Sequence, residues 1–308
     1  ALAFAPGIWA AFLIRLVGGM AAGNGAVIQG YIADVTPPEK RARQLSYQGA
    51  AWNVGLIVGP SIGGLFAHTN AGPAGFRIPL FIASGLALLC VIAIMLFIRE
   101  SRVRETGFTD KPSRWAAMAE AFRHPVIARL MLLTFLIGFA FTGIESVFGL
   151  WAQARFDWGP RDVGLSFAFV GVAAFFTQTL ITGRLSERFG EGPMLAAGMA
   201  LTVVAMILQI FSTGGVMTTA LMCVTAMGQS VAFPNVAAMI SRVADPHRQG
   251  QIMGLNNAAG ALARVAGPLS VSLVFAAYIN GPFVLAALVV APAIFLAVSA
   301  SRRARLSG

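Results

Sequence analysis

Charged residues are scarce in this chain of 308 residues. Only 11% of the residues are Asp, Glu, Lys or Arg, whereas 57% are hydrophobic, and the mean hydropathy is +0.76. Because soluble globular domains carry about 25% charged residues, this composition excludes that class and predicts a membrane protein.

Cysteine and histidine are also scarce, and their positions exclude some kinds of site. The two cysteines, Cys90 and Cys223, both fall inside long apolar runs, which indicates small apolar residues rather than a disulfide or a metal site. The three histidines, His68, His124 and His247, each stand alone in or beside a loop, and no H-x-x-x-x-D motif occurs. We therefore expect no metal, no cofactor and no enzymatic activity.

Long apolar runs are abundant. Each has roughly 18–25 residues, enough at 1.5 Å per residue to cross the ~30 Å hydrocarbon layer. The runs are continuous and lack the period-two alternation of a lipid-facing barrel, so we predict an all-α membrane protein. Nine spans are expected, at about residues 8–33, 44–67, 77–98, 127–151, 163–183, 193–211, 216–241, 250–276 and 281–300.

The positive charges, which give a net charge of +10, are distributed unevenly along the chain. With residue 1 outside, seventeen Lys and Arg residues lie in inside segments, whereas only Arg77, Arg155 and Arg161 lie in outside segments. Cytoplasmic loops carry such an excess, so the charge predicts an inner-membrane topology with a cytoplasmic C-terminus rather than a nucleic-acid-binding surface. The seventeen residues are Lys40, Arg41, Arg43, Arg99, Arg102, Arg104, Lys111, Arg114, Arg123, Arg129, Arg184, Arg188, Arg242, Arg248, Arg302, Arg303 and Arg305.

Residues 31–64 recur, shifted by 208 positions, at residues 239–272. In both segments the polar end of an apolar run leads into a tight basic turn and then a second apolar run with a Gly-Pro pair. Two copies in the same orientation indicate two parallel halves, which is an architecture of membrane transporters. The seven identical pairs are Ile32/Ile240, Val35/Val243, Pro38/Pro246, Ala50/Ala258, Ala51/Ala259, Gly59/Gly267 and Pro60/Pro268.

The longest polar stretch, residues 99–124, divides the nine spans unequally, with three before it and six after it. We predict that residues 1–98 are the remainder of an N-terminal half, residues 99–124 a cytoplasmic linker, and residues 125–308 a C-terminal half with a short cytoplasmic tail. Two equal halves need twelve spans. We therefore expect that the first three are missing from this sequence and that the 308 residues do not transport without them.

Several polar side chains lie inside the predicted spans, where they are costly and mark functional sites by default. Glu145, about seven residues from the outer end of the fourth span, either handles protons or substrate, lines a wet outer cavity, or pairs with an Arg. Arg264, near the middle of the eighth span, pairs with a carboxylate or helix-end carbonyls, or meets water or an anionic substrate. The other polar candidates are Arg15, Asn24, Gln178, Asn235, Asn256 and Asn257.

Two short motifs accompany the spans. The second span contains G-x-x-x-G-P-x-x-G-G, whose proline kinks the helix and whose glycines form a flat contact surface, for packing only or also for gating. The fifth span ends in G-R-L-S-E-R-F-G, an inner turn that is either a solvated loop or a specific charged contact. The motif residues are Gly55, Gly59, Pro60, Gly63 and Gly64 in the span, and Gly183, Arg184, Glu187, Arg188 and Gly190 in the turn.

Together these segments resemble the major facilitator superfamily, and most closely its drug:proton antiporter branch, which includes the tetracycline efflux pumps. The likeness is carried by RLVGGMAAG, ADVTPPEKRARQ, GLIVGPSIGG and GRLSERFGE, and it covers essentially all 308 residues as spans four to twelve of twelve. It implies that Arg15 takes part in proton transfer, that the span motif is the antiporter signature, and that the turn is the second copy of the inner gating motif.

The sequence departs from that pattern in two ways. The first gating motif and the first span, where the family places substrate and proton residues, belong to the missing portion. The sixth span, residues 193–211, has no carboxylate, whereas tetracycline pumps have an Asp there. The resemblance therefore does not imply tetracycline as the substrate, and Glu145 is a candidate for the coupling role.

The resemblance implies a secondary transporter, and we expect an H⁺-coupled exporter of drugs or other amphipathic small molecules whose halves rock about a midplane cavity. We expect a monomer in the lipid bilayer whose partners are protons and a small-molecule substrate, with no nucleic acid. The nearest alternative is an importer or exporter of a small metabolite with the same fold. A membrane-embedded enzyme and a non-transporting scaffold are alternatives from other classes. A membrane-embedded enzyme would need a polar catalytic cluster, and the sequence shows none. The charged residues inside the spans, Arg15, Glu145 and Arg264, argue against a scaffold.

Overall fold

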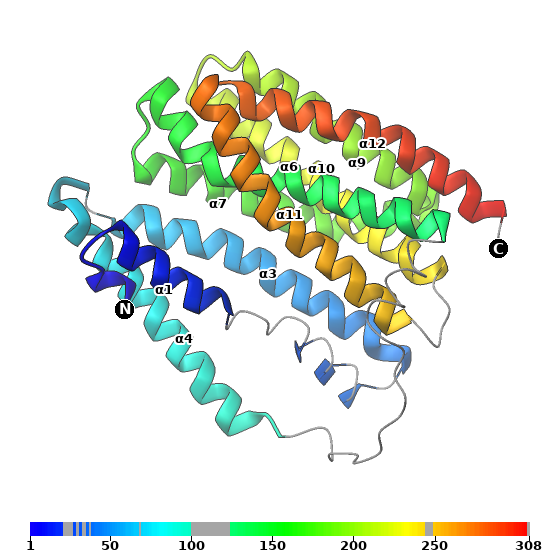
Figure 1. Ribbon diagram of the computed structural model, residues 1–308. Coiled ribbons are helices and arrows are strands. Elements are labelled where there is room, and N and C mark those ends of the chain that lie inside the picture. Colours follow the sequence, from blue (N-terminus) through cyan, green and yellow to red (C-terminus); the bar gives the residue numbers. More distant parts are fainter. Residues whose placement is uncertain are drawn as a thin grey trace. The chain divides into compact units, whose positions relative to one another are not determined.

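The computed structural model describes residues 1–20, 27–28, 31–32, 35–36, 38–67, 69–99, 124–243 and 249–306. Every regular element in those ranges is helical, as predicted (Figure 1). The long helices are α1 (Ile8–Met20), α3 (Pro38–Phe66), α4 (Arg77–Phe97), α6 (Pro125–Phe156), α7 (Pro160–Phe176), α9 (Glu191–Ile210), α10 (Gly215–Val243), α11 (Gln249–Ala277) and α12 (Gly281–Leu306). Short elements are η1 (Leu2–Phe4), η2 (Thr69–Phe76), a π-helical segment (Thr177–Thr182) and α8 (Gly183–Phe189).

Each of the nine long helices overlaps one predicted span, and residues 21–26, 29–30 and 33 of the first span lie outside the described residues. Seven segments in the described ranges are long and apolar enough to cross a membrane, and two shorter apolar stretches, Ile8–Met20 and Ile57–Phe66, belong to α1 and α3. The basic turn before the second span is shorter than predicted, because α3 begins at Pro38. Proline is well tolerated in a first helical turn, where its missing N–H needs no partner. The linker at residues 100–123 lies outside the described residues.

The chain forms two compact units by its contacts. One comprises Ala1–Asp110 with Pro160–Leu165, and the other comprises Lys111–Gly159 with Ser166–Gly308. In the N-terminal unit, Arg77 ties the start of the chain to α4: its Nε donates to the carbonyl oxygen of Ala3 at 3.2 Å, and its guanidinium lies 5.5 Å from the Phe4 ring centroid. None of the residues of α4 is buried, so its apolar surface is available to lipid.

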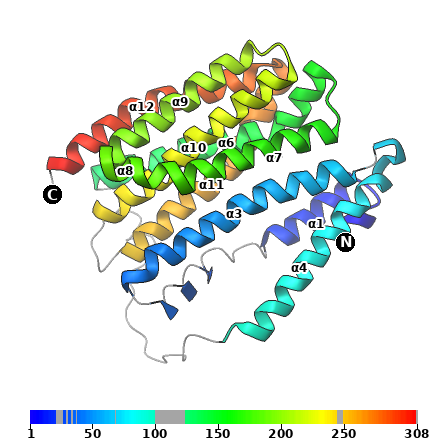
Figure 2. The ribbon, with the colours of Figure 1, turned by 180° about the vertical axis from the view of Figure 1, so that it is seen from behind.

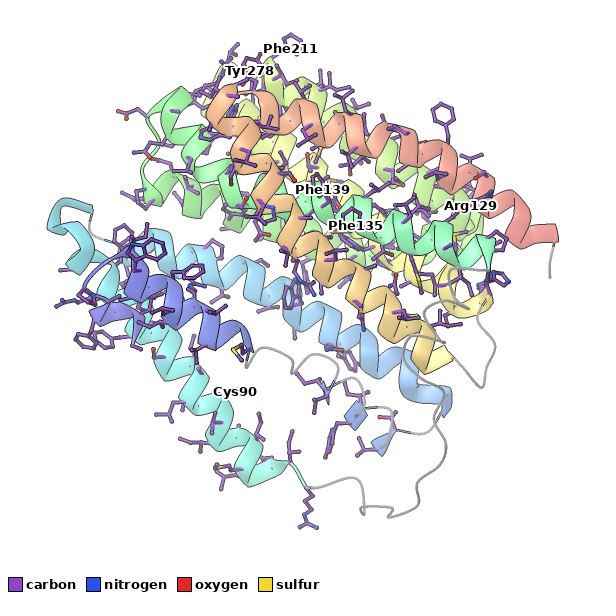
Figure 3. All side chains as sticks on the ribbon, in the orientation of Figure 1. Cys90, Arg129, Phe135, Phe139, Phe211 and Tyr278 are labelled. Carbon is purple, nitrogen blue, oxygen red and sulfur yellow. The ribbon has the colours of Figure 1, made fainter. Side chains whose placement is uncertain are left out.

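The core of the C-terminal unit forms around α6, which packs against α10, α11 and α12, while α9 packs against α10 and α12 (Figure 2). Leu130, Leu133 and Ile137 of α6 are almost completely buried. Phe139 joins Ala263 and Val271 of α11 in one apolar cluster, beside Phe135 (Figure 3). A helix that is apolar on most of its surface belongs in the interior of a bundle, and most residues of α6 are apolar, which explains why it has this place.

Small residues allow two helix pairs of this unit to approach closely. A Cβ atom on Gly198 of α9 would lie 2.6 Å from the carbonyl oxygen of Gly228 on α10. A Cβ atom on Gly267 of α11 would lie 2.5 Å from the carbonyl oxygen of Phe139 on α6. In lipid, helix association depends on such packing, so these contacts hold the C-terminal unit together.

One end of the C-terminal unit is closed by a buried aromatic cluster. The indole Nε1 of Trp151 donates to Oδ1 of Asn280 at 3.0 Å, and the Trp151 ring packs edge-on against Phe283 at 4.8 Å between centroids. Both Trp151 and Asn280 are buried. The contact ties the C-terminal part of α6 to the turn between α11 and α12.

Candidate transport site

The antiporter motif lies in the C-terminal half of α3, and its glycines have different surroundings. A Cβ atom on Gly64 would lie 2.7 Å from the carbonyl oxygen of Pro160 and 2.9 Å from Cα of Gly164. Among the described residues, a Cβ atom on Gly55, Gly59 or Gly63 would meet no atom within 4 Å. The close backbone approach that the motif predicts is therefore present at Gly64.

Pro60 lies inside α3, and because it has no N–H it cannot donate to the carbonyl four residues before it. The hydroxyl of Ser61 donates to the carbonyl oxygen of Ile57 at 2.6 Å, next to the carbonyl that Pro60 leaves without its helical donor. The carbonyl oxygen of Pro60 itself lies 2.7 Å from the position of a Cβ atom on Gly164. The proline thus lies at the same close contact as Gly64.

The second predicted motif is helical rather than a turn. Residues Gly183 to Phe189 form α8, and the chain reverses only at Gly190, whose φ of 87° favours glycine. Arg184 donates from Nη1 to the carbonyl oxygen of Leu180 at 2.6 Å, and Arg188 stacks on Phe189 at 5.4 Å. The spacing of charges in this segment is compatible with either a loop or a short helix, and only the glycine at its end marks the reversal.

An ion pair forms one residue beyond that motif. Oε1 of Glu191, the first residue of α9, lies 2.8 Å from Nη2 of Arg242 near the end of α10. Glu191 is the more enclosed partner, with 16% of its side chain exposed against 76% for Arg242. The pair is not evident from the sequence, because its two members are 51 residues apart and only the packing of α9 on α10 brings them together.

A π-helical segment separates α7 from α8. It contains Gln178, and the hydroxyl of Thr182 at its end lies 3.1 Å from the carbonyl oxygen of Thr177 and 3.2 Å from that of Ser230. Ser230 precedes Pro234 by four residues, so its carbonyl lacks the donor that a helix would supply. The Thr182 hydroxyl of the π-helical segment is therefore within hydrogen-bond distance of the Ser230 carbonyl, which lacks a helical donor because of Pro234 in α10.

Two of the predicted polar candidates are buried inside the C-terminal unit. Asn235, next to Pro234, donates from Nδ2 to the carbonyl oxygen of Val231 at 2.8 Å. Asn256 is also buried, whereas its neighbour Asn257 is exposed on α11. Asn235 and Asn256 are therefore not on the surface of this unit.

Glu145 and Arg264 are both exposed on the C-terminal unit. Glu145 lies on α6 and Arg264 on α11, and the two helices run in parallel, since Gly138 contacts Ala263 and Gly143 contacts Gly267. Within the described residues of this unit, neither charge has an ion pair or a hydrogen bond. Of the predicted candidates in the first span, Arg15 is exposed on α1, and Asn24 lies outside the described residues.

A model of the Major Facilitator Superfamily matches residues 1–268 and, a second time, residues 130–306. The chain belongs to the Major Facilitator Superfamily. Tetracycline resistance protein class C of Escherichia coli is 31% identical over 280 residues, covering 90% of this chain and 69% of that protein. Multidrug resistance protein 2 of Bacillus subtilis is 26% identical over 287 residues, covering 90% and 69%. Quinolone resistance protein NorA of Staphylococcus aureus is 26% identical over 275 residues, covering 89% and 69%.

Solved structures of this superfamily share the fold. The human organic anion transporter MFSD10 matches with a TM-score of 0.70 at 24% identity, covering 96% of this chain and 72% of that one. The Escherichia coli fucose:proton symporter FucP matches with a TM-score of 0.64 at 11% identity, covering 90% and 73%. The superfamily consists of transporters, so this chain is a multi-pass membrane transporter and not an enzyme.

Proposed function

We propose that this superfamily member is a proton-coupled exporter of amphipathic small molecules, working by alternating access in the inner (plasma) membrane. The names of its relatives record resistance to tetracycline, to several drugs and to quinolones. The two units, joined through the predicted linker, are the natural candidates for the two rocking bodies. The C-terminus would face the cytoplasm, and a single chain would be the working unit.

The observation that carries the proton coupling is Glu145. It is a carboxylate within a span of α6, exposed on the surface of the C-terminal unit, and no described cation of that unit neutralises it. A membrane carboxylate of this kind is expensive to keep charged, so it gains a proton or a cationic ligand readily. Two ligands that compete for one carboxylate provide the exchange that antiport requires.

The remaining motif residues would support the conformational cycle. Arg15 would assist proton transfer, and the Gly64 contact would set how closely α3 approaches its neighbour. The α8 segment and the Glu191–Arg242 ion pair lie at one end of the C-terminal unit, where the predicted inner gate would close.

The test uses everted membrane vesicles that contain the full-length protein and an acidic interior. Dye accumulation driven by the pH gradient should be lost in Glu145→Gln, and dye binding to the purified variant should weaken and lose its dependence on pH. Asp157→Asn is the matched control, because it removes a carboxylate at the end of the same helix and keeps a residue tolerant of the φ of 56° found there.

Unchanged proton coupling in Glu145→Gln would place the proton site elsewhere in the protein. Accumulation only with the opposite gradient would indicate a symporter of the same fold, and thus an importer.

A further inference from the structure

The exposed surface of α11 carries two different stripes. Leu262, Val265, Leu269 and Leu273 form an apolar stripe in which every side chain is more than half exposed. The neighbouring stripe consists of Asn257, Ala261 and Arg264, spaced i, i+4 and i+7, all of them exposed. The leucine-rich stripe suits lipid, whereas the stripe with Arg264 needs water or a polar ligand.

Arg264 lies at the middle of its span. It follows Ile252 by 12 residues and precedes Ala277 by 13, which are the limits of the apolar segment. At 1.5 Å per residue, the guanidinium-bearing residue is therefore ~18 Å from one end of the span. A cation at such depth is kept where it meets a counter-charge, and the described residues of the C-terminal unit offer it none.

Helix geometry places Glu145 on the same side of the α6–α11 pair. Thr142 and Gly267 mark the contact line, since a Cβ atom on Gly267 would lie 2.8 Å from the Thr142 hydroxyl oxygen. Glu145 follows Thr142 by three residues, and Arg264 precedes Gly267 by three. On parallel helices that face each other, these opposite rotations of about 60° turn both residues to one side, with an axial separation of ~9 Å.

We propose that Glu145 and Arg264 form a dipolar recognition site for zwitterionic amphipathic molecules. The cationic group of the ligand contacts the Glu145 carboxylate, and its carboxylate receives paired hydrogen bonds from the Arg264 guanidinium. The charges are of opposite sign and form no ion pair with each other or with another described residue of their unit, so one ligand that carries both charges can satisfy both. The inference rests on the proposed function: the proton displaces the cationic group at Glu145, while Arg264 sets the substrate class.

Two dyes that differ in one methyl ester test the site. Rhodamine 110 carries a cationic ring system and a free carboxylate, whereas rhodamine 123 is its methyl ester and lacks the negative charge. In the same everted vesicles, the wild-type protein should transport rhodamine 110 with an apparent KM about tenfold lower than that for rhodamine 123, the ratio expected of one charge-assisted contact.

Arg264→Gln should raise the KM for rhodamine 110 to that for rhodamine 123 and leave rhodamine 123 unchanged. Arg264→Lys should keep part of the preference, because it retains the charge and loses the paired geometry. Val265→Ala, the next residue on the lipid-facing stripe, should leave the ratio of the two KM values as in the wild type. Fluorescence anisotropy of each dye with the purified, monodisperse variants reports the same ratio for binding alone.

The proposal is wrong if the wild type shows no preference for rhodamine 110, or if Arg264→Gln keeps the wild-type ratio. Fluorescein, which is anionic, should be a poor substrate. If it were transported as well as rhodamine 110, recognition would involve only the negative charge and the role of Glu145 as a cation site would fall. Loss of gradient-driven transport for both dyes in the wild type, with the binding preference intact, would contradict the proposed function and leave this site standing.

Discussion

At the scale of single residues, buried polar side chains stabilise this protein by providing hydrogen-bond partners for other buried polar groups. The indole N–H of Trp151 is enclosed in the core and has Asn280 as its acceptor. A buried donor that loses its acceptor retains its desolvation penalty, which is larger than the net gain from an ordinary hydrogen bond. Polar residues in and beside these spans therefore divide into buried ones that bond within the bundle, such as Asn235 and Asn280, and exposed charges, which the proposed transport mechanism uses.

Asn280→Leu should lower the free energy of unfolding by about 1–3 kcal/mol, because it leaves the Trp151 indole N–H buried without an acceptor. Thermal unfolding followed by tryptophan fluorescence in detergent measures the loss. Tyr278→Phe, at an exposed position in the same turn, should leave the stability unchanged. Equal melting temperatures for Asn280→Leu and the wild type would show that this hydrogen bond does not stabilise the fold.

The charged residues at mid-span could be found from the sequence alone, because an ionised side chain in an apolar run is conspicuous. Whether these residues are exposed could not be predicted from the sequence, since it depends on which face of each helix packs on its neighbours. Asn235 shows the reverse case: the same polar signal in the sequence belongs to a side chain that bonds within its own helix.

At the scale of helices, the two copies of the repeat differ in what they contact. Gly59 and Gly267 occupy equivalent positions, yet Gly267 packs against α6 while Gly59 has open space among the described residues. The pairing predicts that Gly59 faces the helix of the N-terminal half that is equivalent to α6. Within this chain, the close contact of the antiporter motif is at Gly64.

Gly64→Ala should therefore impair transport more than Gly63→Ala does. The added methyl group would lie 2.7 Å from a backbone carbonyl oxygen at position 64, and a backbone atom cannot move aside as a flexible side chain can. Initial rates of dye accumulation in vesicles, normalised to the amount of inserted protein, give the comparison. The packing argument fails if the two alanine variants transport equally well.

The π-helical segment was not predictable, because TQTLIT carries no signature that separates it from α-helix. The segment ends at Thr182, whose hydroxyl lies 3.2 Å from the Ser230 carbonyl oxygen that Pro234 leaves without a helical donor. The prediction of a turn at Gly183–Phe189 was wrong, because this segment forms the helix α8. Its charges indicated solvent exposure, which a short surface helix provides as well as a loop does.

Thr182→Val keeps the shape of the side chain and removes that hydroxyl, so it should cost about 1 kcal/mol of stability. Thr179→Val is the control, since the Thr179 hydroxyl bonds only within its own helix and is exposed. Thermal unfolding of both variants decides the matter, and a greater loss in Thr179→Val would contradict the account of the segment.

At the scale of the whole molecule, the sequence predicted an all-α membrane protein with nine helices, because the length and continuity of apolar runs depend little on tertiary detail. It predicted the superfamily because the residues of the Gly-Pro motif and of the charged motif occur at the spacing that is typical of that family.

The orientation of the chain in the membrane remains a prediction. Single cysteines at Asn70 and Lys111, in a protein without Cys90 and Cys223, should react with an impermeant thiol reagent from opposite sides of the membrane. Labelling from the same side would contradict the seventeen-to-three charge bias as a guide to topology.

The central claim is proton-coupled export, and proton movement driven by a substrate gradient tests it most directly. Liposomes containing the full-length protein, a trapped pH-sensitive dye and no initial pH gradient would receive rhodamine 110 on one side. The account predicts that protons move against the direction of rhodamine flux, and that this movement disappears in Glu145→Gln but not in Asp157→Asn. Protons moving with the substrate, or substrate flux without any proton movement, would contradict it.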